Sequence, residues 1–86
     1  MKKTQTNKKM TCYDIFAANL RGLMAMKDIS PEEMSAYMGI SSATFYKRLR
    51  RPYEFSMSNV EAAAKKLGAP AGGMISKIME VEEFAG

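Results

Sequence analysis

The chain has 86 residues, of which 13 are Lys or Arg and 9 are Asp or Glu, so its net charge is +4. It holds no His and one Cys, which excludes an internal disulfide, a His-based catalytic triad and the usual structural zinc sites. No apolar run approaches the ~18 residues of a membrane span, so we expect a small, basic, cytoplasmic domain without metal or cofactor.

The first ten residues, MKKTQTNKKM, are polar and basic and show no apolar period. This composition predicts a disordered arm. From Thr11 the pattern changes, because Thr11 and Asp14 fit a capping box at a helix start. Apolar residues then recur at helical spacing, at Phe16, Leu20, Leu23 and Met24. The pattern predicts a first helix over residues 12–26.

The clearest helix start lies at Ser30 and Pro31. Ser30 suits the N-cap, Pro31 suits the first helical position, and Glu33 can complete a capping box. We predict a second helix of about eight residues, ended by Gly39, because the residue after a helix often has a positive φ.

A third helix is predicted directly after this turn, capped by Ser41 and ended near Arg50 or Arg51 by Pro52. Its apolar residues, Phe45 and Leu49, are four apart and are expected to face the core. Residues 52–55 are predicted to form a loop.

A fourth helix is predicted to begin at Ser56 or Ser58 and to end at Gly68. Its expected buried residues are Met57, Val60, Ala64 and Leu67. A last helix, over roughly residues 73–84, has a poorly specified start because Gly72 and Gly73 weaken a helix. The sequence therefore predicts an all-α fold, a bundle of four to five helices.

The second and third helices and the tight turn at residues 39–41 have the spacing of a helix-turn-helix. In this motif the outer face of the second of its two helices enters the major groove of DNA. All Lys and Arg residues of the range 31–55 fall within residues 47–51, and no carboxylate lies between Glu33 and Glu54. The pattern indicates a nucleic-acid surface, although a solvated helix face would show the same charges.

The outer face of the third helix carries hydroxyl, methyl and basic groups. Hydroxyls can bond bases or phosphates, a methyl can contact thymine, and cations can reach guanine or phosphate. Candidate base-reading residues are Ser41, Ser42, Ala43 and Lys47, and candidate backbone contacts are Thr44, Tyr46, Arg50, Arg51 and Tyr53.

Residues 30–68 resemble the lambda-repressor-like (Cro and phage-repressor type) helix-turn-helix family. The matching elements are SPEE, the apolar Met34, the small Ser35, the turn GIS and the pair Thr44-Phe45. The stretch TFYKRLRRPYEFS is especially similar to small phage and prophage regulators of Gram-positive bacteria. The resemblance implies a bundle that binds operator DNA as a homodimer, with the same four base-reading positions and with Ser30 added to the backbone contacts.

The sequence departs from the family at three places. Pro31 stands where many members have a Gln that contacts phosphate, and a proline side chain has no donor for that contact. Ser35 stands where many have Ala, and Leu49-Arg50-Arg51 replaces a common Glu-x-Gly, which makes the surface more basic.

We therefore predict three parts: a basic arm at 1–10, a DNA-binding domain at 11–70 and a C-terminal element at 71–86. Apolar residues on one side of this last element suggest a dimer interface formed by Met74, Ile75, Ile78, Met79 and Phe84. The expected function is a sequence-specific transcriptional regulator rather than an enzyme, binding double-stranded DNA and neither membranes nor small ligands. The alternative is a helical interaction module, such as an antitoxin or antirepressor component, without strong DNA binding.

Overall fold

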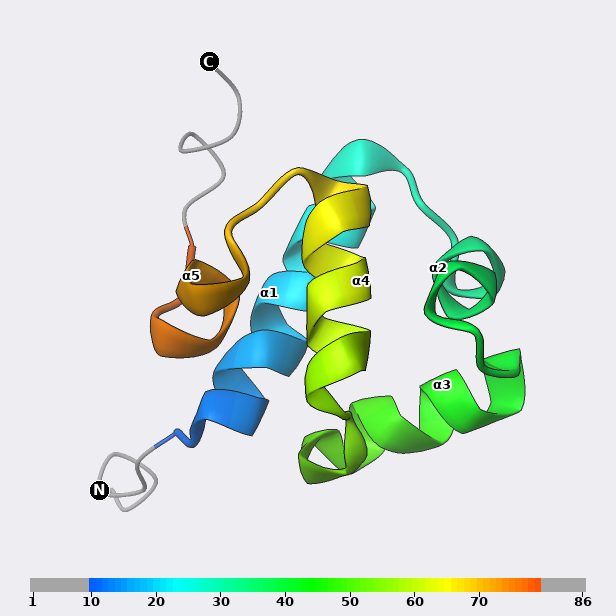
Figure 1. Cartoon of the computed structure of the whole chain (residues 1–86), viewed down its shortest axis with the longest axis horizontal. Coiled ribbons are helices and arrows are strands. Elements are labelled where there is room, and N and C mark those ends of the chain that lie inside the picture. Colours follow the sequence, from blue (N-terminus) through cyan, green and yellow to red (C-terminus); the bar gives the residue numbers. More distant parts are fainter. Residues whose placement is uncertain (1–9, 80–86) are drawn as a thin grey trace, which may run out of the picture.

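A computed structural model describes residues 10–79. Within this range the chain forms five α-helices and a short 3-10 helix and no strand, which confirms the predicted all-α class. Figure 1 shows α1 and α4 at the centre, α5 on one side of them, and α2 and α3 on the other. The helices are α1 (Cys12–Lys27), α2 (Pro31–Met38), α3 (Ser42–Arg50), η2 (Pro52–Glu54), α4 (Met57–Leu67) and α5 (Ala71–Ser76).

Side-chain caps set the starts of the first four α-helices, as predicted. Thr11 Oγ1 accepts from the amide of Asp14 at 3.2 Å, and the Asp14 carboxylate accepts from the amide of Thr11 at 3.1 Å. The hydroxyls that accept in the same way at α2, α3 and α4 belong to Ser30, Ser41 and Ser56. The predicted box at Glu33 is not completed, because the Glu33 carboxylate instead pairs with Lys66 Nζ at 3.1 Å.

Left-handed residues end three of the helices. Gly39 (φ 78°) and Gly68 (φ 69°) end α2 and α4 where the sequence places them. Helix α1 runs one residue past its predicted end and stops at Asp28, which adopts φ 58° although it is not a glycine. Aspartate tolerates this conformation better than most residues, so the turn between α1 and α2 forms without glycine.

The core draws residues from every α-helix and from the segment between η2 and α4. Phe55 comes from this segment, and its ring centroid lies 5.2 Å from that of Phe16 and 6.2 Å from that of Phe45. The prediction that Met57 is buried is wrong: it is the first residue of α4 and is 57% exposed. The buried cluster comprises Phe16, Leu20, Leu23, Met24, Met34, Phe45, Phe55, Val60, Ala63, Ala64, Leu67 and Met74.

The C-terminal part differs most from the prediction. Residues 52–54 of the predicted loop form a 3-10 turn. Helix α5 begins at Ala71 and ends at Ser76, so the predicted helix over 73–84 starts too late and is not helical at residues 77–79, while residues 80–84 lie outside the described part. The buried side chain of Asn19 fixes this region: its Nδ2 donates to the carbonyls of Met74 and Lys77, both at 2.9 Å. Its Oδ1 accepts from the amide of Met79 at 2.8 Å.

Candidate nucleic-acid interface

Helices α2 and α3 pack at a large angle around a three-residue turn. Figure 1 shows α2 nearly end-on while α3 lies across the view. The amide of Ile40 donates to the carbonyl of Ser35 at 3.0 Å, which folds the turn back onto α2. Ser35 is 3% exposed, and the neighbouring Met34 and Phe45 are fully buried. A small side chain is therefore buried on the helix that precedes the turn.

The first turn of α3 holds its hydroxyls in a local network. Ser41 Oγ accepts from the Thr44 amide at 3.1 Å and donates to Thr44 Oγ1 at 3.0 Å. The Ser41 proton is thus used within the cap, while its oxygen keeps one free lone pair. Thr44, whose oxygen accepts this bond, keeps its own proton for a phosphate or base acceptor.

The outer face of α3 is open along its length. Ser41, Ala43 and Lys47 are exposed and Ser42 is half-buried, so the four predicted base-reading residues lie together at the cap and on α3. Tyr46 on the same helix is 43% exposed, and Tyr53 on η2 is 61% exposed. The exposed polar side chains can therefore contact a ligand without a change in the packing.

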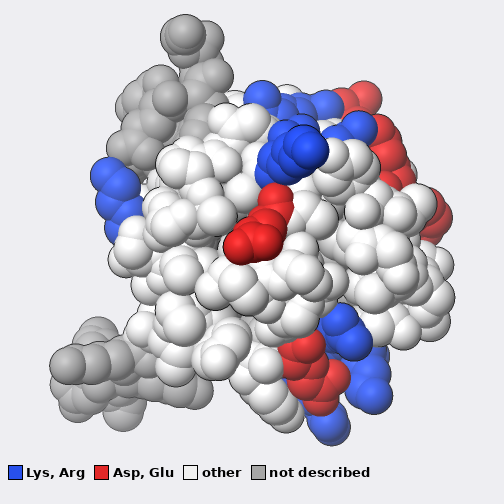
Figure 2. Space-filling model, viewed as in Figure 1, with Lys and Arg blue, Asp and Glu red and all other residues white. Residues whose placement is uncertain are grey.

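Basic side chains gather towards the C-terminal end of α3. Lys47 and Arg50 are exposed and form no ion pair within residues 10–79. Arg51 is 60% exposed and lies 3.8 Å from the Glu54 carboxylate, a loose surface pair. Figure 2 shows Lys and Arg side chains at the lower edge of the molecule over α3, next to an acidic side chain, and further acidic side chains over α2.

Two other arginines near α3 have partners in the protein. Arg48 Nη1 donates to Asn59 Oδ1 at 2.8 Å, and the same oxygen accepts from the Ser56 amide in the cap of α4. Arg21 Nη2 of α1 donates to the carbonyl of Leu49 at 3.3 Å, near the end of α3. The sequence does not indicate this contact of Arg21, because its partner is a backbone carbonyl 28 residues away.

Ser30, the remaining predicted backbone contact, lies at the N-terminus of α2. Its oxygen accepts from the Glu33 amide at 3.0 Å, so its proton is left for an external acceptor. A hydroxyl at the positive end of a helix dipole is suited to a phosphate oxygen. Glu32 and Glu33 in the same turn are exposed and lower this local positive potential.

The predicted dimer interface at the C-terminal end is only partly exposed. Met74 is completely buried in the core, so its assignment to a surface patch is wrong. Ile75 and Met79 are half-buried against the core, and Ile78 is 48% exposed. Phe84 lies outside the described residues, as does the predicted arm up to residue 9. Within the described part, α5 belongs to the same core as α1 and α4.

Comparison of the chain with protein-family models, with curated proteins and with solved structures gave no match. Within residues 10–79, no three His, Cys, Asp or Glu side chains come close enough together to hold a metal ion. In the same range no helix combines the length and the apolar composition that crossing a bilayer requires.

Proposed function

We propose that α2, the turn and α3 form a helix-turn-helix of the lambda-repressor-like type, and that the outer face of α3 binds the major groove of duplex DNA. The observation that carries this proposal is the chemistry of that face: hydroxyl and methyl groups near the N-terminus of α3, cations near its C-terminus, and no carboxylate from Ser41 to Tyr53. The N-terminal residues of such a helix are the ones that reach base edges.

In this proposal one group of side chains contacts the bases and another contacts the DNA backbone. Ser41, Ser42, Ala43 and Lys47 face the bases, with Lys47 directed at guanine acceptors and Ala43 at a thymine methyl. The backbone contacts come from the hydroxyls of Ser30, Thr44, Tyr46 and Tyr53 and the cations of Arg50 and Arg51. Arg48 is left out of this set because the Asn59 amide already holds it.

The biological role that follows is regulation of transcription by occupancy of an operator. A homodimer would present two copies of α3 about 34 Å apart, one turn of DNA, and would select a palindromic site. The similarity of TFYKRLRRPYEFS to phage and prophage regulators supports a repressor or Cro-like role in a bacterial or phage-infected cytoplasm.

The proposal is tested by selecting bound sequences from a random duplex pool with the full chain. The expected result is an enriched palindrome whose half-sites lie about ten base pairs apart, centre to centre. A pool that stays random after several rounds at low salt would contradict sequence-specific binding. That outcome would favour the alternative, a helical interaction module that keeps the bundle without reading DNA.

A further inference from the structure

Arg21 of α1 reaches the end of α3. It is an exposed residue, and its Nη2 atom donates to the carbonyl of Leu49 at 3.3 Å. The carbonyls in the last turn of a helix carry partial negative charge, so they attract a cation. A guanidinium has five N–H donors, and this bond uses one of them. The end of α3 therefore holds the guanidinium in place and leaves most of its donors open to a ligand.

Arg21 and Arg50 line the same open hollow on the surface. The hollow has a volume of about 450 Å³ and lies between α1 and the end of α3. Neither arginine forms an ion pair within residues 10–79. Two cations from different helices therefore border one surface that a ligand can reach.

One acid also lines this hollow, but it is held by the cap of α1. Asp14 Oδ2 accepts from the amide and from the hydroxyl of Thr11, both at 3.1 Å. The charged residues of the lining are thus one carboxylate and two guanidinium groups, which leaves a net charge of +1. The hollow is suited to an anion.

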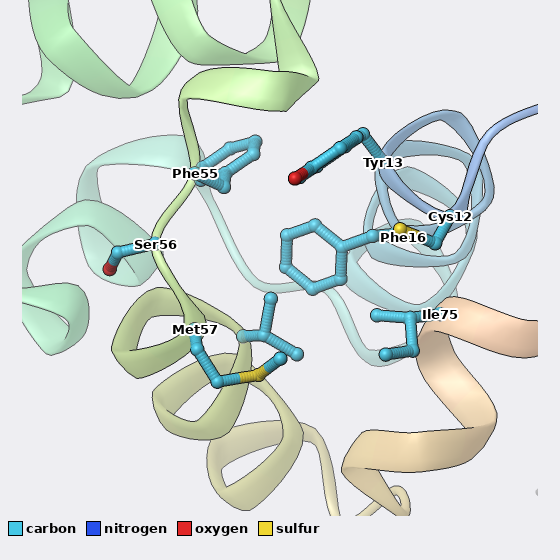
Figure 3. Close-up of a pocket in the computed structure, with 8 residues that line it drawn as sticks. Cys12, Tyr13, Phe16, Phe55, Ser56, Met57 and Ile75 are labelled. Carbon is cyan, nitrogen blue, oxygen red and sulfur yellow. The ribbon is translucent and has the colours of Figure 1, made fainter.

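A second hollow shows no such preference. It lies between the start of α1, residues 55–60 and α5, and all of its lining residues are uncharged. Figure 3 shows Phe16 and Ile75 bordering it from two of these segments. Charge therefore distinguishes the hollow beside Arg21 from the other one.

Arg50 connects the hollow beside Arg21 to the proposed DNA face, because it is one of the backbone contacts proposed for α3. Duplex DNA carries one phosphate charge per ~1.7 Å of its axis, so a backbone that passes one cation presents further phosphates beside it. The anion that continuity with the α3 face favours is therefore a phosphate of the same DNA.

We propose that Arg21 binds a phosphate of the DNA backbone next to the contact of Arg50, an inference that rests on the proposed function of α3. The planar guanidinium matches two phosphate oxygens. The contact extends the DNA surface from α3 to α1 and adds affinity without reading sequence. Arg48 does not take part, because it is half-buried and bound to the buried Asn59.

The test measures binding of the full chain to duplex DNA over a range of salt concentrations. Arg21→Gln is expected to reduce the slope of log K against log salt by about 1, because one phosphate contact is lost. Near 0.1 M salt this corresponds to binding about fivefold to tenfold weaker. Arg21→Lys keeps the cation and should retain most of the slope.

Lys65→Gln is the matched control. Lys65 is exposed in the last turn of α4, which Figure 1 shows away from α3, and its substitution removes the same charge. Its slope should equal that of the wild type. All three substitutions are at exposed residues, so circular dichroism should show wild-type helix content.

Phosphate ethylation interference supplies an independent readout. At least one phosphate whose ethylation blocks binding of the wild type should no longer affect binding of Arg21→Gln. The bases that the chain prefers should stay the same in this variant, because a phosphate contact carries no sequence information.

An Arg21→Gln slope equal to that of the wild type would overturn the inference, since Arg21 would then act only through its bond to Leu49. Equal losses of slope in Arg21→Gln and Lys65→Gln would also overturn it, because net charge alone would explain them. The salt titration works with any duplex. A chain that binds all duplexes alike, with the slope lost only in Arg21→Gln, would support the Arg21 contact and contradict only the proposed reading of bases.

Discussion

The arginines at the end of α3 have different partners although they are neighbours in sequence. Arg48 is held by Asn59, which is 4% exposed and also completes the cap of α4. Arg50 is exposed and pairs with no acid within the described residues. In the run KRLRR, Arg48 therefore links α3 to α4, whereas the side chain of Arg50 remains available to a ligand.

This difference leads to a matched pair of substitutions. Arg48→Ala removes a charge-assisted hydrogen bond to a buried amide, so the free energy of unfolding should fall by about 1–2 kcal/mol in urea titrations. Arg50→Ala should leave that free energy within about 0.5 kcal/mol of the wild type, because it is an exposed site. In fluorescence titrations with duplex DNA, Arg50→Ala should reduce the slope of log K against log salt by about 1. Equal stability losses in the two variants would contradict this division.

At the scale of elements, the turn between α2 and α3 depends on one backbone conformation. Gly39 has φ 78°, and a Cβ added there meets no atom within 4 Å, so only backbone strain opposes a side chain. Gly22 lies inside α1, has no positive φ and also faces open space. The two glycines thus separate the effect of left-handed backbone from the effect of glycine in a helix.

Substitution by alanine should therefore act in opposite directions at the two sites. Gly39→Ala should lower the free energy of unfolding by about 1 kcal/mol, because alanine resists the left-handed region. Gly22→Ala should raise it by about 0.5–1 kcal/mol, because alanine loses less entropy in a helix. Urea unfolding of both variants measures the difference, and a stabilised Gly39→Ala would show that α2 does not end in this conformation.

Helix α5 is held to α1 by the buried side chain of Asn19 as well as by the packing of Met74 in the core. Removing the Asn19 amide leaves two carbonyls and the Met79 amide without their partner. Asn19→Ala should therefore cost about 2–3 kcal/mol of unfolding free energy. Amide hydrogen exchange should rise mainly over residues 71–79, while α2 and α3 keep their protection. Uniformly faster exchange in all helices would contradict a local role for Asn19.

The elements that the sequence predicts well are the ones fixed by local chemistry. Thr11, Ser30, Ser41 and Ser56 accept from amides three residues away, so their caps can be read directly along the chain. Helix α5 has no side-chain cap, and its position depends on Asn19, 55 to 60 residues away. No periodicity within residues 71–86 contains that information, which is why the predicted helix over 73–84 was misplaced.

The candidate site shows the same division. The exposed face of α3 can be predicted once Phe45 is placed towards the core, and the apolar spacing within this nine-residue helix is enough to place it there. A cavity beside Met57 is lined by the start of α1, by residues 55–60 and by Ile75. Because these three segments are far apart in the chain, no single stretch of sequence indicates the cavity. Met57 itself has an apolar side chain, and only the fold shows that its position at the start of α4 leaves it exposed.

At the scale of the whole molecule, charged and uncharged surfaces are separated. The cations beside α3 lie at the lower edge of the molecule, where Glu54 is the acidic neighbour of Arg51, and other acidic side chains lie over α2 (Figure 2). A cavity whose lining residues are all uncharged lies between α1, the start of α4 and α5. A net charge of +4 would by itself favour any polyanion. The arrangement supports a narrower proposal, in which α3 reads base sequence and the surrounding cations hold the phosphates.

The most direct measurement of that proposal repeats the duplex selection with Lys47→Ala and Arg51→Ala in parallel with the wild type. Lys47→Ala should change the preferred base at one position of each half-site, because it removes a contact to a base edge. Arg51→Ala should weaken binding to all sequences alike and enrich the wild-type site, because it removes a phosphate contact. Two variants that both enrich the wild-type site with wild-type affinity would show that α3 does not bind DNA through this face.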